Sequence, residues 1–322
     1  MRVVVIGGTG HTGTYLIPRL VEAGYDVAVI SRQQCPRYPA DGIAGKVGWQ
    51  RLEWVEMDRA EADAAGNFGA RVVALKPDIV IDMICYQPES AQQLVDALRG
   101  RIQLLVHCGS IWAGGASLQV PGAESEPRRP ICDYGRRKAA IEEYLLAEAR
   151  RGGLPVTVLR PGHMVGRGWV PVNPVANFNP QVYSALARGK EVRLPNLGME
   201  TLHHVHCDDV AQAFMLALAN HNGAVGEAFN VVSPSALTLR GYAEAVAGWF
   251  GKPANLWFRP WEEWKKTASE EDAAVTWDHI LHSSCCSIEK ARKVLGYQPR
   301  YTSLEAVKES LGWLIQNGRV EA

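Results

Sequence analysis

The sequence lacks the features that mark membrane, secreted or nucleic-acid-binding proteins. No stretch of its 322 residues approaches the roughly 20 apolar residues that span a bilayer. A strand-like apolar run begins at residue 2, which leaves no room for a secretory signal. Lys plus Arg and Asp plus Glu both number 34, so no net charge attracts nucleic acid or an acidic membrane. We expect a cytoplasmic protein with a small-molecule substrate and no nucleic-acid or membrane partner.

Patterned cysteines are also lacking, and the histidines form no convincing metal motif. The seven cysteines are odd in number and include no Cys-x-x-Cys pair, which favours reduced thiols over disulfides or zinc. A cluster of His203, His204 and His206 precedes Asp208 and Asp209. Imidazoles and carboxylates are metal ligands, but positions 204 and 206 would lie on a strand whereas the two aspartates would cap a helix. We expect no metal.

The order of apolar and amphipathic segments predicts an α/β fold. Short apolar runs typical of buried parallel strands alternate with helical patterns, and residues 33–50 are predicted to form a loop. This alternation implies right-handed crossovers and a doubly wound parallel Rossmann sheet. We expect residues 1–165 to form this domain and residues 166–322 a smaller C-terminal α/β substrate lobe, with segments around 203–232 returning to the Rossmann domain. The predicted strands of the first part are 3–6, 26–31, 52–56, 79–84, 102–107 and 156–160.

A glycine-rich turn directly follows the first strand and precedes a helix. Gly7 permits a tight turn, Gly10 lets the backbone approach a pyrophosphate, and Gly13 lets the helix pack closely on the sheet. Free amides at the start of that helix favour phosphate. The turn therefore predicts a dinucleotide site, and the residues expected to form it are Gly7, Thr9, Gly10, His11, Thr12 and Gly13.

The residues after the second and third strands bear on which dinucleotide binds. An NAD-preferring site usually places an acidic side chain after the second strand, whereas this chain has Ser31 and Arg32. A hydroxyl and a guanidinium suit a 2′-phosphate, so we expect NADP, with NAD as the alternative. Arg32 could also simply point into solvent. Asp58 could bind the adenine amino group or serve as a loop or cap carboxylate.

A tyrosine and a lysine four residues apart lie at the start of a helix predicted over 134–150. The spacing places Tyr134 and Lys138 on one face, where the ammonium should lower the pKa of the phenol toward neutrality. Such a phenol can exchange a proton with a substrate oxygen while hydride moves to or from C4 of a nicotinamide. Ser110, just beyond a strand end, would lie in the ligand-binding crevice of such a sheet and could orient that oxygen.

These three features, in this order, resemble the short-chain dehydrogenase/reductase superfamily, in particular its extended NAD-dependent epimerase/dehydratase branch. The resemblance implies that Tyr134 is the acid/base, that Lys138 activates it and binds ribose, and that Ser110 orients the substrate. Pro161 and His163 would border the nicotinamide. The similar segments are GGTGHTG, CGSIWAGG, DYGRRKAAIEEYL, LRPGHMVGRG, HHVHCDDVAQAF, GEAFNVV and KARKVLGYQP.

The resemblance also bears on substrate and partners. Sugar-nucleotide members often carry an Asn at the position of His163 and an Arg near Leu202, both of which grip a diphosphate, and this chain has neither. The substrate could therefore be another carbonyl or alcohol compound instead of a sugar nucleotide. His163 could be a second proton-transfer group or a substrate contact. The family commonly dimerises through the tyrosine-bearing helix, so we expect a homodimer through the Tyr134 helix. The apolar residues of that helix fit this role or packing on the sheet: Ala139, Ile141, Leu145 and Leu146.

Two functional hypotheses follow. The first is an NAD(P)-dependent oxidoreductase or epimerase that moves hydride between nicotinamide C4 and a hydroxyl or ketone carbon of a sugar-like or other small molecule. The second is an epimerase-like Rossmann protein that binds RNA or another ligand without turnover, because the segment 278–299 is similar to that of chloroplast RNA-binding relatives. Retention of the Tyr134–Lys138 pair favours the first.

Overall fold

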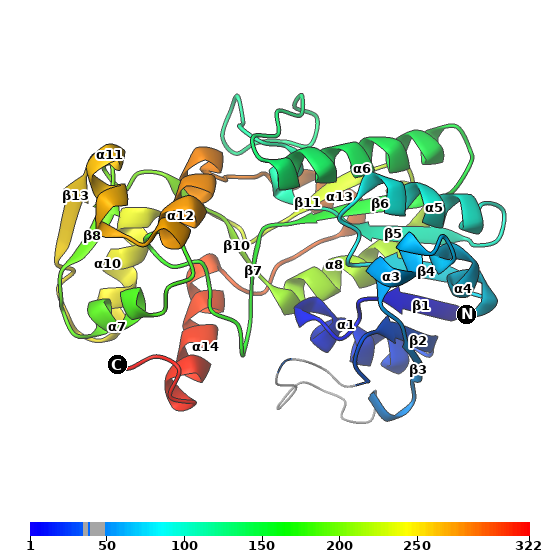
Figure 1. The fold of residues 1–322 in the computed structure, drawn as a ribbon, viewed down its shortest axis with the longest axis horizontal. Helices are drawn as coiled ribbons and strands as arrows, with labels where there is room; N and C mark the ends of the chain where they lie inside the picture. The colour runs from blue at the N-terminus through cyan, green and yellow to red at the C-terminus, as the bar shows by residue number, and fades with distance from the viewer. Residues whose placement is uncertain (35–37, 39–48) are drawn as a thin grey trace.

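The protein consists of a large body built on a sheet and a smaller lobe beside it (Figure 1). The computed structural model describes residues 1–34, 38 and 49–322. The loop predicted over residues 33–50 lies mostly outside these residues. Within the described part of the chain, no helix combines the length and apolar character needed to cross a membrane.

The large body contains a seven-stranded sheet in the order β11-β6-β5-β4-β1-β2-β3. Every neighbouring pair in it is parallel. The chain runs outward from β1 to β3 and then crosses back to β4, so the direction of winding reverses between β1 and β4, where such sheets bind ligands. The strands are β1 (Arg2–Ile6), β2 (Asp26–Ser31), β3 (Glu53–Glu56), β4 (Ile79–Asp82), β5 (Leu104–Cys108), β6 (Val156–Pro161) and β11 (Ala228–Val231).

Helices cover both faces of this sheet. In β1, Val3 and Val5 pack on one layer and Val4 and Ile6 on the other, and all four are fully buried. Because the inner strands are enclosed on both sides, they read as nearly continuous apolar runs, and the predicted doubly wound α/β fold is confirmed. One layer contains α1 (His11–Glu22), α8 (Cys207–Ala219) and α13 (Glu289–Leu295), and the other α3 (Arg59–Ala64), α4 (Phe68–Ala74), α5 (Pro88–Leu98) and α6 (Asp133–Arg150).

The smaller lobe has an apolar core of its own. Tyr183 and Tyr242 are fully buried in it, with their hydroxyl oxygens 2.8 Å apart. Short strands pair in twos, β8 with β13 and β9 with β12. The lobe contains α7 (Gln181–Ala187), β8 (Val192–Pro195), β9 (Thr201–Leu202), β12 (Leu237–Thr238), α10 (Leu239–Trp249), β13 (Leu256–Arg259), α11 (Trp261–Trp264), α12 (Glu270–His282) and α14 (Ser303–Gln316).

Two short strands connect the bodies. β7 (His163–Val165) leaves the large body just after β6, and β10 (His204–His206) returns toward it just before α8. They pair in parallel, with His163 opposite His204. This pair places residues of the later chain beside the carboxyl ends of the main strands.

The start of α8 differs from the prediction. The helix begins one residue before Asp208, and its N-cap is His206, whose Nδ1 accepts a hydrogen bond from the Asp208 amide at 3.1 Å. Asp209 instead accepts the backbone N–H groups of Arg300 and Tyr301 at 2.9 and 3.1 Å. Histidine and aspartate side chains can both accept a hydrogen bond from a helix N-terminal amide, so the sequence alone could not say which residue caps α8.

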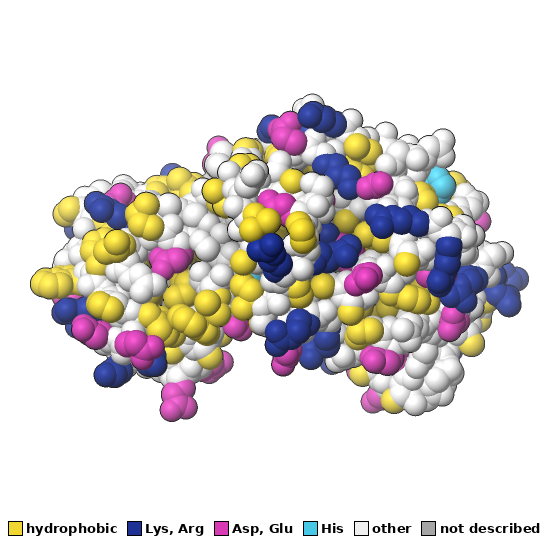
Figure 2. All heavy atoms as spheres, turned by 90° about the horizontal axis from the view of Figure 1, so that it is seen from above, with side chains coloured by type: hydrophobic (Ala, Val, Ile, Leu, Met, Phe, Trp, Pro, Cys, Tyr) yellow, Lys and Arg dark blue, Asp and Glu magenta, His cyan; other side chains and the backbone are white. Residues whose placement is uncertain are grey.

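The surface of the large body carries both charge signs. Figure 2, which looks onto the α6 side, shows Lys and Arg side chains interspersed with Asp and Glu. On α6 itself, Arg136 pairs with Asp133 at 2.6 Å. This mixed pattern matches the zero net charge of the sequence.

Candidate functional site

The glycine-rich turn after β1 has a backbone path that only glycine can follow. Gly7 has φ +82°, and a Cβ there would lie 2.6 Å from Ile84. A Cβ on Gly13 would lie 1.9 Å from the carbonyl oxygen of Gly8, so α1 packs directly on the strand–turn junction. Gly10, the N-cap of α1, provides no side chain to bond the first amides. The turn therefore fits a pyrophosphate, which those amides could bind.

The polar side chains of the turn face neighbouring segments. His11 packs between Tyr38 and Trp169, with ring centroids 4.5 and 5.5 Å away. Burial lowers the pKa of His11 to about 4, so its imidazole is neutral at pH 7. The Thr12 hydroxyl lies 3.4 Å from the sulfur of Met164. His11 and Thr12 thus offer a ligand mainly their backbone amides.

The residues predicted to choose the dinucleotide lie around the ends of β2 and β3. The Ser31 hydroxyl donates to the Gln33 carbonyl at 2.5 Å. The Arg32 side chain is 72% exposed, and its Nη1 lies 3.9 Å from Asp58 Oδ2. Asp58 Oδ1 accepts the Ala60 amide at 2.8 Å, so the carboxylate caps the start of α3. A cap carboxylate is one of the two roles predicted for Asp58.

Lys138 is a buried cation in the crevice between β4 and β5. Its Nζ donates to the carbonyl oxygens of Cys85 and Cys108, each at 2.8 Å, and the residue is only 2% exposed. The same Nζ lies 4.9 Å from the centroid of the Tyr86 ring. An ammonium has three N–H donors, so one remains for a ligand such as a ribose hydroxyl.

Tyr134 and Ser110 meet beside this lysine. Their side chains share a hydrogen bond, and Ser110 Oγ also accepts the amide of Trp112 at 3.2 Å. Tyr134 lies 6.5 Å from Tyr86, ring to ring, so Tyr134 and Lys138 face the same side of α6. The structure brings the three predicted catalytic residues together.

The protonation of Tyr134 differs from the prediction. Burial raises the pKa of this phenol above its ordinary value, and the hydrogen bond with Ser110 only partly offsets the effect. The expected lowering by Lys138 is wrong because that ammonium is directed to the two strand carbonyls. Tyr134 is therefore a protonated phenol at neutral pH.

A small cavity opens between these residues and the start of β7. Ser110, Tyr134 and Lys138 line it together with Pro161 and Met164. The remaining lining residues are Met83, Tyr86, Cys108, Gly109 and Gly162. Pro161 thus borders the space beside Tyr134, whereas the ring of His163 turns toward the smaller lobe, 5.1 Å from His279.

The clustered histidines before α8 point in three directions. His203 Nε2 contacts the Ser233 carbonyl at 2.9 Å and His204 Nε2 the Val172 carbonyl at 3.0 Å. His206 Nε2 contacts Glu309 at 2.5 Å. Among the described residues, no group of three or more His, Cys, Asp or Glu side chains is arranged to hold a metal ion.

Sequence reasoning missed two features of the site. Trp112 follows Ser110, and its ring stacks on His282 of α12 with centroids 4.1 Å apart and planes 9° apart. At the end of β4, buried Asp82 pairs with Arg59 at 2.5 Å. The signal for Asp82 was an acidic residue within the apolar run 79–84, but no sequence signal linked Trp112 to a residue 170 positions later.

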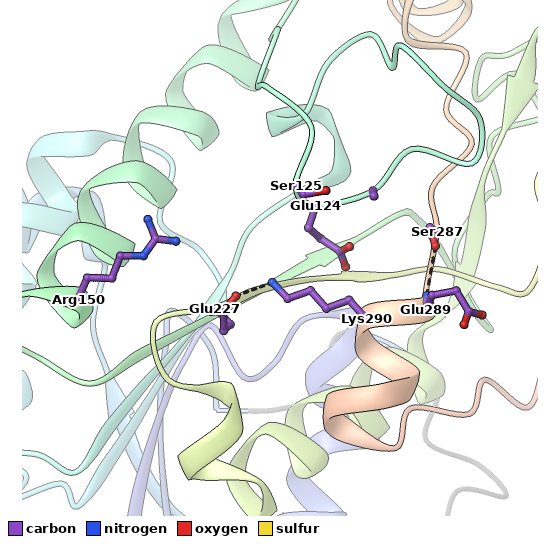
Figure 3. A pocket seen from close by; sticks show the side chains of 8 residues that line it. Glu124, Ser125, Arg150, Glu227, Ser287, Glu289 and Lys290 are labelled. Carbon is purple, nitrogen blue, oxygen red and sulfur yellow. Dashed lines mark hydrogen bonds and ion pairs between the residues drawn. The ribbon is translucent and has the colours of Figure 1, made fainter.

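A second cavity of about 350 Å³ lies near the far end of α6 (Figure 3). Charged side chains line it, and several of them bond one another or the backbone. Lys290 contacts Glu227 at 2.6 Å, and Glu124 accepts the amide of Asn230 on edge strand β11 at 2.7 Å. Arg150, which lines this cavity, ends α6 about 24 Å from Tyr134 along the helix. These contacts fasten a loop and α13 to the sheet edge.

The apolar residues of α6 pack within the chain. Ile141, Leu145 and Leu146 belong to the sheet core, and Ala139 is also buried. Of the two roles that these residues could have, the structure shows packing on the sheet.

Comparison with known proteins identifies the family. The model described as "NAD dependent epimerase/dehydratase family" matches residues 3–231, which is more than half of the chain. The chain belongs to this family. The resemblance seen in the sequence is thereby confirmed, and so is the prediction of an enzyme of the extended short-chain dehydrogenase type.

Individual relatives span nearly the whole chain. It is 28% identical to 2'-dehydrokanamycin reductase of Streptomyces kanamyceticus over 99% of this chain and 86% of that protein. It is 25% identical to the chloroplast stem-loop binding protein of 41 kDa b of Arabidopsis thaliana over 96% and 78%. The structure of UDP-glucuronic acid 4-epimerase from Bacillus cereus in complex with NAD matches with a TM-score of 0.73 at 18% identity, covering 98% of this chain and 99% of that one. The last match shows the shared fold.

Proposed function

We propose that this member of the family is an oxidoreductase or epimerase that moves hydride between a nicotinamide and a hydroxyl or ketone carbon of a sugar-like or other small molecule. The observation that carries the proposal is the contact of Tyr134, Ser110 and Lys138 around one cavity at the carboxyl ends of β4 and β5. Bound there, the coenzyme would supply or accept the hydride at C4.

The residues have distinct roles in this proposal. The turn at Gly7–Gly13 binds the pyrophosphate through backbone amides, and the free N–H of Lys138 binds a ribose hydroxyl. Ser110 holds the substrate oxygen next to Tyr134. When a carbonyl is reduced, the carbon gains hydride, and its oxygen takes the proton from Tyr134 Oη, which becomes a phenolate.

The buried phenol of Tyr134 is in the protonation state that carbonyl reduction requires. A general acid must carry its proton when the substrate arrives, and the buried phenol does so at neutral pH. Oxidation of an alcohol would need the phenolate. The 28% identity to a reductase over nearly the whole chain is consistent with this direction.

For the coenzyme we propose NADP rather than NAD. Arg32 is exposed at the end of β2 and could bind a 2′-phosphate. Asp58, 3.9 Å from Arg32, is already committed to capping α3. NAD-preferring sites usually carry an acidic residue after the second strand, whereas this chain has Arg32 there, and this supports NADP.

A substrate screen tests the proposed function. NADPH absorbance is followed with a panel of keto sugars and other ketones, and the purified protein is assayed for coenzyme that copurifies. A reductase consumes one NADPH per product, whereas an epimerase retains its coenzyme without net absorbance change. If no coenzyme binds and no compound turns over, the proposal is wrong.

The second candidate is a binding module without turnover, and the similarity to a stem-loop binding protein is the observation that favours it. The mixed surface charge in Figure 2 and the assembled Tyr134 site favour an enzyme instead. Salt-dependent retention on RNA, together with no turnover, would establish this alternative.

A homodimer through α6 and a cytoplasmic location remain proposals from the sequence. Because Ile141 and Leu145 pack on the sheet, such a dimer would use the outer, polar face of α6, which carries Arg136 and Glu143. Sedimentation equilibrium of the wild type and of Glu143→Arg tests it. The dimer predicts about twice the chain mass for the wild type and weaker association for the variant.

A further inference from the structure

A run of ring side chains passes from the sheet to the smaller lobe through Tyr134. Trp112 lies 6.0 Å from Tyr134 and 5.1 Å from His279, ring to ring, and Phe178 lies 5.8 Å beyond His279. Tyr86 continues the run on the other side of Tyr134 at 6.5 Å. The two ends are open, since Tyr86 is 49% and Phe178 41% exposed. We call these five side chains the aromatic wall.

His163 lies beside this wall and has an unpartnered ring nitrogen. Its ring is 5.1 Å from that of His279 and 6.4 Å from that of Trp112. Its Nδ1 lies 3.2 Å from the His203 amide nitrogen and 3.1 Å from the His203 carbonyl oxygen, so Nδ1 is engaged in either tautomer. Its Nε2 is buried and bonds no described residue. A buried polar atom without a partner costs about 1–3 kcal/mol, so a hydroxyl that bonded His163 Nε2 would remove that cost.

The imidazoles around this nitrogen are uncharged at neutral pH. Burial lowers the pKa of His204 and of His279 to about 4. The titratable groups that act most strongly on His163 are those two residues and His203, all imidazoles. A phosphate or carboxylate ligand is usually bound by Arg or Lys, and neither is among the groups that shift the pKa of His163.

The imidazole of His279 has a defined hydrogen-bonding direction. Its Nδ1 donates to the Val275 carbonyl within α12 at 2.7 Å, which leaves Nε2 as an acceptor. The aromatic wall therefore combines ring faces with neutral hydrogen-bonding nitrogen atoms. Two members of the wall, Tyr86 and Tyr134, also line the small cavity beside Lys138, so this end of the wall borders open space.

We propose that the aromatic wall and His163 form the substrate subsite, and that it binds an uncharged hydroxylated ring, such as a glycoside or cyclitol, rather than a nucleoside diphosphate. The proposal rests on the proposed function, because the wall includes Tyr134. The C–H faces of such a ring pack on aromatic side chains, and its hydroxyls both donate and accept. One hydroxyl would bond His163 Nε2 and another His279 Nε2.

The test measures binding to the full chain saturated with NADP⁺, independently of turnover. The imidazole resonances of His163 and His279, assigned with His163→Gln and His279→Gln, are followed during titration with methyl α-D-glucopyranoside, myo-inositol and UDP. At least one neutral ring should shift both resonances, and UDP should shift neither. Each variant should raise the dissociation constant of that ring about tenfold or more. His221→Gln, outside the wall, should leave it within about twofold.

The outcomes separate this inference from the function on which it rests. If NADP⁺ binds but no neutral ring shifts the two resonances, or if UDP shifts them, the subsite assignment is wrong while the oxidoreductase stands. If no coenzyme binds, both are overturned. Should His279→Gln fail to fold, Phe178→Ala replaces it, because the exposed Phe178 side chain contributes little to the core.

Discussion

Lys138 places its Nζ 2.8 Å from the carbonyl oxygen of Cys108 and equally far from that of Cys85. The lysine thus joins the ends of two neighbouring strands to α6, at the point where Tyr134 enters the crevice. A residue expected to serve catalysis also satisfies two carbonyl oxygens of the fold. Its loss should therefore affect stability as well as coenzyme binding.

Replacing Lys138 with Met should lower both the stability of the fold and the affinity for the coenzyme. Methionine fills a similar volume but leaves the two carbonyl oxygens without a donor, so the free energy of unfolding should fall by about 2 kcal/mol. Coenzyme affinity should fall as well, because the ribose loses its donor. Urea denaturation and a coenzyme titration measure the two effects. Lys293→Met, on the exposed side of α13, is the matched control and should change neither. Unchanged stability of Lys138→Met would contradict the structural role.

Arg32→Ala should weaken NADPH binding and spare NADH. A charge-assisted bond to a 2′-phosphate is worth about 1.5–3 kcal/mol, which corresponds to a dissociation constant raised about tenfold or more. Fluorescence titration with both coenzymes measures the difference. Equal effects on NADPH and NADH would mean that Arg32 does not bind a 2′-phosphate.

Asp58→Asn should tighten NADPH binding severalfold. Asparagine caps a helix as well as aspartate does, so α3 should remain intact. The substitution removes a negative charge 3.9 Å from Arg32 that opposes the 2′-phosphate. The same titration measures it, and Asp63→Asn, which also lies on α3 but pairs with Arg59, serves as control. Weaker NADPH binding by Asp58→Asn would argue that Asp58 contacts the coenzyme itself.

Stability should fall steeply between pH 6.5 and pH 4. Burial lowers the pKa of His203, His204 and His279 to about 4 in the folded chain, whereas an unfolded histidine titrates near 6.5. Between these values the unfolded chain binds more protons, so each imidazole costs the fold about 1 kcal/mol per pH unit. Urea denaturation at pH 7, 6 and 5 tests this. A free energy of unfolding that stays constant over that range would contradict the burial of neutral imidazoles.

The features that the sequence predicted correctly are those that depend on residues close together in the chain. The turn at Gly7–Gly13 follows from spacing within seven residues, and the strands follow from continuous apolar runs enclosed on both sides. The spacing of Tyr134 and Lys138 likewise placed both on one face of α6. These features need no knowledge of distant residues.

The features that were missed or wrong depend on contacts between distant segments. The pKa of Tyr134 depends on burial and on which atoms the Lys138 ammonium contacts, and neither follows from a spacing of four. His163 meets His279 from a helix more than 100 residues later, in a region for which the sequence predicted a lobe but no α12. The short helices α3 and α4 were also missed, because six or seven residues carry little helical periodicity.

Tyr134→Phe tests the central claim most directly. The single-turnover rate with NADPH and the substrate found in the screen should fall by about 10²–10⁴, because the proton donor is lost, while the coenzyme dissociation constant stays within about twofold. Tyr144→Phe, later on α6 and outside the cavity, should retain its rate. If Tyr134→Phe turns over at the wild-type rate, Tyr134 is not the proton donor and the proposed mechanism is contradicted.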